Sequence, residues 1–328
     1  MKRESILSVL TLLFLASCSR ERPETVFRTL DTAFYEIPTR SILTASNIET
    51  KKTSVTLAAY AGGKLAVSEH YTTALEAMSL ELDPGETYTI SALVNMGDMT
   101  ASIPRTENDL EALTYRIPSY TEGAESLAGR GLPMAGKLDF PDQGTVIPVE
   151  RLLAKVTAHL SCEWEDAAIR SVRVCNLNRV LLPFGEAVMD EDWDQQEFED
   201  GTGTASGTFV FYVPENRQGT IDGIRTSREK SPDANDEVRA RSDRLTSLET
   251  TVEGTGTIIG TIVYRSFLGR NAVTDFDIQR NARYDWTLRF LQDGLQYDDW
   301  KHENDLVDSQ TGLYIRDGWD DGGETDLH

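Results

Sequence analysis

Cysteine and histidine are scarce in this chain, which limits the thiol and metal sites it can build. Among its 328 residues are only three cysteines (Cys18, Cys162 and Cys175) and four scattered histidines. This set cannot form a disulfide framework and does not have the spacing of a zinc site. A single bridge between Cys162 and Cys175 remains open in an exported protein, although strand alternation places the two on faces of different polarity. His159 falls on the polar face of a predicted strand and is interpreted as a surface residue.

Signatures of catalysis are also missing. The stretch GTGTIIG at 254–260 has its third glycine one position late for a nucleotide-binding loop, and a β-type run follows it instead of a helix. We find no nucleophile elbow, no His-Glu metal signature and no Walker motif. The sequence therefore predicts a protein that is not an enzyme and needs no cofactor.

Basic residues are too few for nucleic-acid binding. The chain has 32 Lys and Arg against 54 Asp and Glu, a formal net charge of -22. Nucleic-acid binding depends on Lys and Arg that neutralise phosphates, so this class of partner is excluded. Much of the acidic excess is local, in 185–201 and in the tail from Asp293, which we interpret as solvated segments.

Calcium is the alternative reading of these acidic segments. An EF-hand loop needs glycine at its sixth position and glutamate at its twelfth. The loop from Asp190 has Gln195 and Gly201 at those positions, and the loop from Asp317 has Trp319 at its third. Neither is a calcium loop, and no metal ligand is predicted.

No hydrophobic run is long enough to cross a membrane as a helix. The longest, from Ile6 to Ala16, is about half of the roughly 20 residues required. It follows Lys2 and Arg3 and ends in small residues, the pattern of a secretory signal peptide. We therefore expect residues 1–17 to be a removable signal.

The end of this signal resembles the lipobox of bacterial lipoproteins. In LASC, the cysteine is Cys18, which by this resemblance carries acyl chains such as palmitate and becomes the mature first residue. Two or more chains give a lasting membrane anchor. The residue after it is Ser19 rather than aspartate, which favours the outer membrane. The alternative is an ordinary signal whose cleavage region happens to contain a cysteine.

The rest of the chain reads as short alternating strands. TSVTLAAYAGGKLAV predicts a hairpin that turns at Gly62-Gly63, and SLELDPGETYTISALVN predicts a second one at a Pro-Gly turn. A short helix is expected at TENDLEAL, with Thr106 as its N-cap and Asp109 three residues on. Many such strands predict an all-β fold of two β-sandwich domains with long loops.

A segment rich in turn-forming residues, 139–148, separates the two expected domains, 41–148 and 149–328. After it, Ala154, Val156, Ala158, Leu160 and Cys162 share one strand face, and AIRSVRVCNL runs back. Later strands are expected in GTFVFYVPEN, GTIIGTIVYRSFLG and RYDWTLRFL. The charged stretch 227–244 is predicted to be a long surface loop, partly helical.

Several of these segments resemble the fimbrillins, the subunits of Bacteroides-type (type V) pili. They are YTISALVNMGD (88–98), LPMAGK (132–137), RLLAKV (151–156), FYVPENRQGT (211–220) and YRSFLGRNAVTDFDIQRNARYDWTL (264–288). The resemblance covers about 50–290, and the pieces occur in the order of the family.

The resemblance implies two transthyretin-like sandwiches in an exported lipoprotein that assembles into a surface fibre and supports cell adhesion. In that family an Arg-specific protease removes an N-terminal segment, and a strand from another pilus subunit fills the uncovered groove. Here the removable segment is 18–40 and the best-matching cut is at Arg40, with Arg28 as second choice. The alternative for Arg40 is an ordinary surface loop residue.

Two features depart from the family pattern. The segment 25–37 does not alternate cleanly, and the C-terminal end offers only Leu313 and Ile315 before it becomes acidic and glycine-rich. A subunit that cannot donate a strand fits the membrane end of a fibre, held in the outer membrane by its lipid. The alternative function is a monomeric surface lipoprotein that binds glycan or a partner protein. The host or bacterial ligand is not specified by the sequence.

Overall fold

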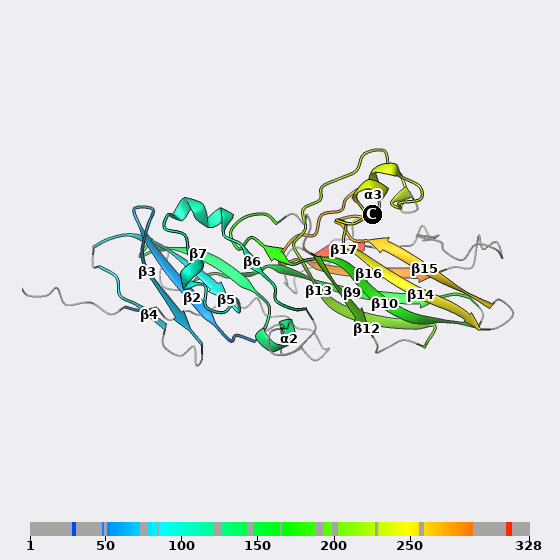
Figure 1. Cartoon of the computed structure of the whole chain (residues 1–328), viewed down its shortest axis with the longest axis horizontal. Coiled ribbons are helices and arrows are strands. Elements are labelled where there is room, and N and C mark those ends of the chain that lie inside the picture. Colours follow the sequence, from blue (N-terminus) through cyan, green and yellow to red (C-terminus); the bar gives the residue numbers. More distant parts are fainter. Residues whose placement is uncertain are drawn as a thin grey trace, which may run out of the picture.

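The chain forms two β-sheet lobes joined end to end (Figure 1). The computed structural model describes residues 28–30, 48, 51–72, 78–83, 85–120, 126–142, 147–164, 166–187, 193–198, 203–226, 229–255, 259–290 and 313–316. Nearly all regular elements in these ranges are strands, and the helices are short. The predicted all-β class is confirmed.

The elements follow one another in a simple order along the chain. The first lobe contains β1 (Arg28–Leu30), β2 (Val55–Ala61), β3 (Lys64–Tyr71), β4 (Met78–Leu80), β5 (Tyr88–Val94), the 3-10 helices η1 (Thr100–Ser102) and η2 (Glu107–Ala112), β6 (Tyr115–Arg116), α2 (Leu127–Arg130), β7 (Met134–Phe140) and β8 (Glu150–Arg151). The second contains β9 (Leu153–Cys162), β10 (Ala167–Asn178), β11 (Val180–Leu181), β12 (Trp193–Phe198), β13 (Ser206–Pro214), α3 (Asp236–Arg241), β14 (Ser247–Thr255), β15 (Ile259–Phe267), β16 (Arg283–Phe290) and β17 (Leu313–Arg316).

The first lobe is centred on a five-stranded sheet of order β3-β2-β5-β7-β8. The predicted hairpin between β2 and β3 is confirmed: Ala61 pairs with Lys64. Gly62 and Gly63 have φ of 53° and 76°, as a two-residue I′ turn requires. The sequence suggested one buried face of β2, but both are buried, since Thr56 and Ala58 are as inaccessible as Val55 and Leu57.

The second predicted hairpin is wrong. β4 pairs with β1 in a separate two-stranded sheet, whereas β5 lies between β2 and β7. Met78 and Leu80 of β4 pack in one core cluster with Leu57 and Ile90 of the large sheet. The Pro-Gly segment therefore leads from one layer to the other, because an apolar β4 is better used to cover the sheet face than to extend its edge.

The expected helix near Thr106 is present, but it is the 3-10 helix η2. The Thr106 hydroxyl donates to the Asp109 carboxylate and makes no capping bond to the backbone. Leu110 of η2 is fully buried under the second face of the large sheet. Packing of this one side chain, rather than a capping box, places the helix.

The second lobe is a sandwich of two four-stranded sheets, β12-β10-β14-β15 and β13-β9-β16-β17. The predicted inner face of β9 is confirmed, and Tyr284, Trp286, Leu288 and Phe290 of β16 are buried in the same core. β9 and β10 do not pair with each other: they lie in opposite sheets, and β9 pairs in parallel with β16. A pattern of alternation gives the face of a strand but not its neighbour.

The charged stretch 227–244 is more ordered than the sequence suggested. It contains α3, whose Asn235 side chain accepts hydrogen bonds from the backbone of Glu237 and Val238. Val238 and Leu245 form a small core with Ile221, Ile224, Phe267 and Phe276. This unit, residues 221–246 with 267–276, is called the α3 module below, and it stands above the second lobe in Figure 1.

The two lobes share one continuous core. The main cluster runs from Tyr60 and Leu110 in the first lobe to Val156 and Tyr284 in the second. At the junction, β6 pairs with β11, and the Arg179 guanidinium donates to the carbonyl oxygens of Ile117 and Pro118 at 3.2 and 2.6 Å. The division at residue 148 stays a prediction, although β8 pairs with β7 of the first lobe.

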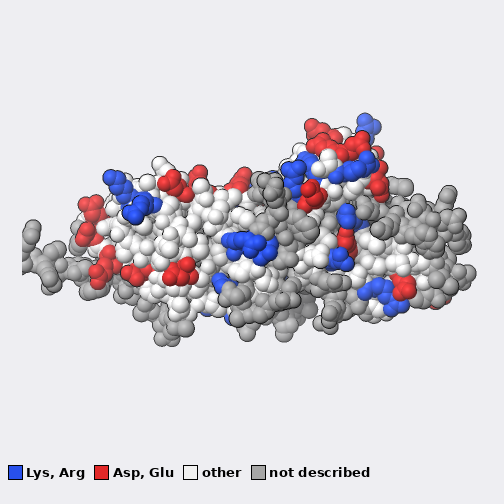
Figure 2. Space-filling model, viewed as in Figure 1, with Lys and Arg blue, Asp and Glu red and all other residues white. Residues whose placement is uncertain are grey.

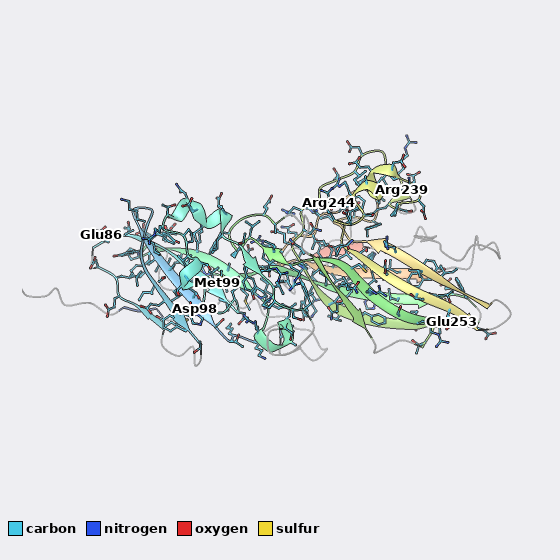
Figure 3. All side chains as sticks on the ribbon, viewed as in Figure 1. Glu86, Asp98, Met99, Arg239, Arg244 and Glu253 are labelled. Atoms are coloured by element: carbon cyan, nitrogen blue, oxygen red, sulfur yellow. The ribbon has the colours of Figure 1, made fainter. Side chains whose placement is uncertain are left out.

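Charged side chains are unevenly spread over the visible face. Figure 2 shows acidic residues along the outer part of the first lobe and closely mixed acidic and basic residues over the α3 module. Figure 3 places Glu86 and Glu253 toward opposite ends of the molecule, with Arg239 and Arg244 on the module.

Candidate strand-exchange site

The N-terminal strand β1 completes the two-stranded sheet that it forms with β4 in the first lobe. Its three residues pair antiparallel with β4, with Arg28 opposite Leu80 and Leu30 opposite Met78. Behind β4, Met78 and Leu80 are 1% exposed, and burial of each side chain contributes about 1.5–3 kcal/mol. β4 is thus fixed by its side chains, whereas within the described residues β1 pairs only with β4.

Loss of β1 would expose an unpaired strand edge. The backbone groups of β4 that face β1 would then have no partner, and such an edge is a template for an added strand. The layer over this core consists of the two-stranded sheet alone among the described strands. Among the described strands, the cover of this core is therefore completed by β1 alone.

The chain that follows the predicted cut is fastened separately. Asn95, which is 1% exposed, accepts from the Thr53 backbone N–H at 2.8 Å and donates to the Lys51 and Leu132 carbonyl oxygens at 2.8 Å each. These bonds hold residues 51–53 against the large sheet. β2 is consequently anchored by contacts that do not involve β1.

The predicted processing residues are only partly visible. Arg28 is the first residue of β1, so its backbone lies in a paired strand. Arg40, Cys18 and the predicted signal at 1–17 lie outside the described residues.

The C-terminal residues, which we expected to be poor at donating a strand to another subunit, form a strand within their own chain. Leu313–Arg316 is β17, and it pairs antiparallel with Arg283–Trp286 of β16. β16 continues to Phe290, and β9 accompanies it over its full length on the other side. β17 thus extends its own sheet along half of β16.

The two cysteines beyond Cys18 are free thiols, and no bridge joins them. Cys162 is on β9 and Cys175 on β10, in opposite sheets. Desolvation raises the pKa of Cys175 to about 12, and Glu249 adds to the effect. Desolvation also raises the pKa of Cys162. Both thiols are protonated at neutral pH and are poor nucleophiles.

The described residues form neither a metal-binding cluster nor a membrane-spanning helix. Nowhere in the described ranges do three His, Cys, Asp or Glu side chains gather closely enough for a metal ion. His159 is exposed and within 3.0 Å of the Thr208 hydroxyl, as its predicted surface position requires. No helix in the described part of the chain is long and apolar enough to span a bilayer.

Two buried charged groups were not anticipated from the sequence. Lys230 is 4% exposed, and its ammonium group donates to the carbonyl oxygens of Asn271 and Asp275 at 3.0 and 2.6 Å. Desolvation lowers the pKa of Lys230 to about 7. At the junction, Arg280 contacts Glu215, which is 3% exposed. Neither pair has a local signal, because the partners are distant in sequence.

The fold defined by these two sandwiches is that of fimbrial and cell adhesion proteins of the Bacteroides group. The tip fimbrial protein Mfa3 from Porphyromonas gingivalis has a TM-score of 0.55 at 13% identity, over 83% of this chain and 96% of that one. A candidate cell adhesion protein from Parabacteroides distasonis has a TM-score of 0.54 at 14% identity, over 91% and 96%. One from Bacteroides eggerthii has 0.53 at 15% identity, over 81% and 88%.

These similarities confirm the fold that the fimbrillin resemblance implied, and none of the three proteins is described as an enzyme. A sequence profile for a domain of unknown function (DUF4906) matches residues 211–288, which include the end of β13, the α3 module and most of β16. No curated protein matches the chain.

Proposed function

We propose that this protein is a structural pilus subunit, or the anchor of a pilus, on the outer surface of the cell, where it supports adhesion. The observation that carries this proposal is the position of β1: a strand from the expected removable segment completes the first lobe through three residue pairs. Such a strand can be replaced without dismantling the large sheet, because β4 and residues 51–53 have their own attachments.

Arg40 is the better of the two cleavage sites. It follows β1 in the sequence, so a cut after Arg40 severs the covalent link between the whole of β1 and the rest of the chain. A cut after Arg28 would leave Thr29 and Leu30 attached and still opposite Ser79 and Met78. Only the first cut frees the entire β4 edge.

Exchange is favourable when the incoming strand buries more apolar surface than β1. A strand that buries about five inward side chains gains roughly 10 kcal/mol before ordering costs. Before cleavage β1 occupies the edge, which suppresses premature assembly. The partners are then other pilus subunits.

The lipid on Cys18 gives the second attachment. A protein that keeps its acyl chains holds the fibre to the outer membrane, and one that loses residues 18–40 is released into the fibre.

The test is digestion of the purified full chain with an Arg-specific protease, followed by electrophoresis without boiling. Ladders that survive SDS are expected, and the Arg40→Lys variant should give none while Arg28→Lys still gives them. A single trimmed monomer in every sample would instead support a monomeric surface lipoprotein that binds glycan or a partner protein. Mass spectrometry of protein from native membranes then separates the roles: diacylated Cys18 marks an anchor, and a free Ser41 marks a polymerised subunit.

A further inference from the structure

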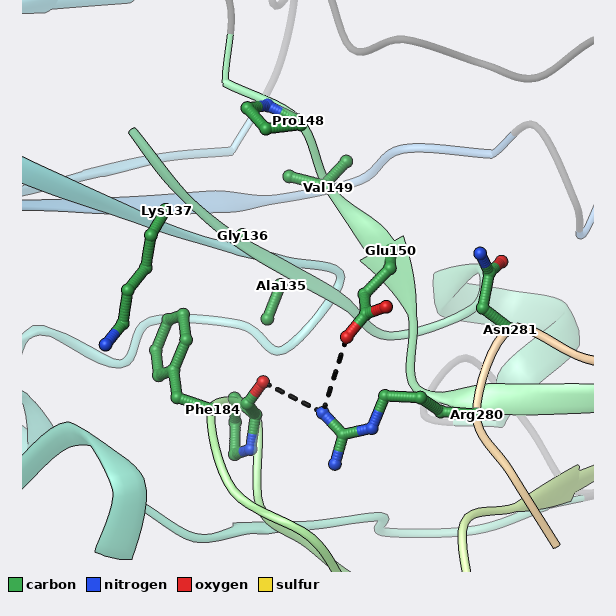
Figure 4. A pocket seen from close by; sticks show the side chains of 10 residues that line it. Ala135, Gly136, Lys137, Pro148, Val149, Glu150, Phe184, Arg280 and Asn281 are labelled. Atoms are coloured by element: carbon green, nitrogen blue, oxygen red, sulfur yellow. Dashed lines mark hydrogen bonds and ion pairs between the residues drawn. The ribbon is translucent and has the colours of Figure 1, made fainter. Parts of the chain in front are cut away.

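A pocket of about 490 Å³ lies where the two lobes meet. Its floor is the β7 backbone at Ala135–Lys137, and its walls come from β8, from the loop after β11 and from the loop before β16 (Figure 4). The volume falls in the range of about 300–1,000 Å³ that is usual for small-molecule sites.

One wall of the pocket is rigid. The Arg280 guanidinium donates to the carbonyl oxygens of Leu182 and Pro183 at 2.9 and 3.1 Å and to the Glu215 carboxylate at 2.9 Å. Its donors are occupied and its charge is balanced by Glu215. Arg280 therefore shapes the pocket but has little left to offer a ligand.

Other polar groups of the lining have free hydrogen-bonding capacity. The Lys137 ammonium group makes no hydrogen bond or ion pair with the described residues, and it lies 5.2 Å from the centre of the Phe184 ring. The Glu150 carboxylate is 53% exposed and only 3.9 Å from Arg280. The buried Oδ1 of Asn281 receives no hydrogen bond from the described residues, so it retains the capacity to accept one.

The apolar part of the lining lies between these groups. Pro148 and Val149 form one side and Pro183 and Phe184 the other, with the Phe184 ring near Lys137 (Figure 4). A ligand that fits must present an apolar face in the middle and both donors and acceptors at its edges. The lining also carries charges of both signs, with the Lys137 ammonium group on one side and the half-exposed Glu150 carboxylate, 3.9 Å from Arg280, on the other.

We propose that this junction pocket binds a neutral sugar residue of a glycan. A pyranose ring has C–H groups for Phe184 and the prolines, and hydroxyls that accept from Lys137 and donate to Glu150 and Asn281. A neutral ligand also suits a chain whose net charge is -22, since an acidic glycan would be repelled. The inference is independent of strand exchange.

The test uses the uncleaved full chain on an array of neutral oligosaccharides that end in glucose, galactose, mannose or N-acetylglucosamine, with sialylated glycans beside them. Retention of at least one neutral glycan is expected, with affinity then measured by calorimetry. The Lys137→Met/Glu150→Ala variant should bind about tenfold more weakly or worse, because it loses hydrogen bonds to charged groups. Phe184→Leu should also weaken binding while it keeps an apolar side chain.

The matched control is Lys64→Met/Glu86→Ala, which makes the same change of charge at exposed positions of β3 and the β4–β5 loop. It should bind as the unchanged chain does. Equal affinity in the control and the pocket variant would overturn the inference, as would the absence of any retained neutral glycan or retention of sialylated glycans alone.

Discussion

At the scale of single residues, Lys230 is the group whose environment most changes its chemistry. It is covered by the α3 module, and its ammonium group lies 4.5 Å from the centre of the Phe276 ring. Burial lowers the pKa of Lys230, and the negative charge of Asp275 opposes this effect. The Asp275 carboxylate is occupied by the backbone N–H groups of Arg270 and Asp277.

Lys230 should make stability rise with pH above neutrality. Its pKa is about 7 in the folded chain against 10.5 for an ordinary lysine, so between these values the unfolded chain holds a proton that the folded chain has released. The free energy of unfolding then increases by about 1 kcal/mol per pH unit through this window. Below pH 7 Lys230 is protonated in both states, and it adds no dependence of stability on pH. Urea titrations at pH 6, 7.5, 8.5 and 9.5 measure this slope.

The Lys230→Met variant should have a flatter dependence on pH than the unchanged chain. The exposed Lys64→Met variant is the control and should keep the original slope, because Lys64 lies on the surface of β3. Equal slopes in the chain and in Lys230→Met would show that this ammonium group does not titrate in the window.

At the scale of elements, the proposed exchange depends on the pair β1 and β4, which differ in how they are held in the first lobe. β4 keeps its place through Met78 and Leu80, while β1 contributes three paired residues. In the proposed exchange, β4 stays in place and the incoming strand pairs with the edge that β1 leaves.

A synthetic peptide with the sequence of residues 25–37 should therefore block assembly of the protease-treated chain. In excess it competes for the β4 edge, and the SDS-resistant ladders should shorten or vanish. The control peptide has proline in place of Thr29, the residue opposite Ser79, and proline cannot donate to the strand ladder. Ladders that are unchanged by either peptide would show that any exchange occurs at an edge other than that of β4.

At the scale of the whole molecule, the two lobes are joined more tightly than a flexible linker would allow. One core cluster passes through the junction, and β6 and β11 pair across it. Arg280 and Glu215 sit at this boundary, with Arg280 close to Glu150 of β8 as well. These contacts make the two lobes a single packed body.

We expect one cooperative unfolding transition by calorimetry and a large effect of Arg280→Leu. Removal of the guanidinium leaves Glu215 buried with only the Ala187 backbone N–H and the Arg217 guanidinium, 3.7 Å away, as partners, which costs about 3 kcal/mol. Arg239→Leu is the matched control, since the Arg239 side chain is 56% exposed, its ion pair is with exposed Asp236 and its remaining hydrogen bond goes to the Asp233 carbonyl oxygen at 3.4 Å, and it should change stability by less than about 0.5 kcal/mol. Two separate transitions in the unchanged chain would contradict the shared core.

The strands and their inward faces could be predicted from the amino-acid pattern, because alternation of apolar and polar residues is a local property of a pleated chain. It was enough to predict the β2–β3 hairpin, the inner face of β9 and the buried side of β16, and through short matching segments it indicated the fimbrial fold. It also drew attention to the N-terminal segment in which β1 lies.

The neighbours of each strand could be seen only in the folded chain. β4 pairs with β1 instead of forming the expected hairpin, and β9 pairs with β16 rather than β10. The charged stretch around α3 packs around a small core and contains a buried lysine. Each of these contacts depends on apolar surface supplied by residues far away in the chain. A pattern within a few residues cannot predict such long-range contacts.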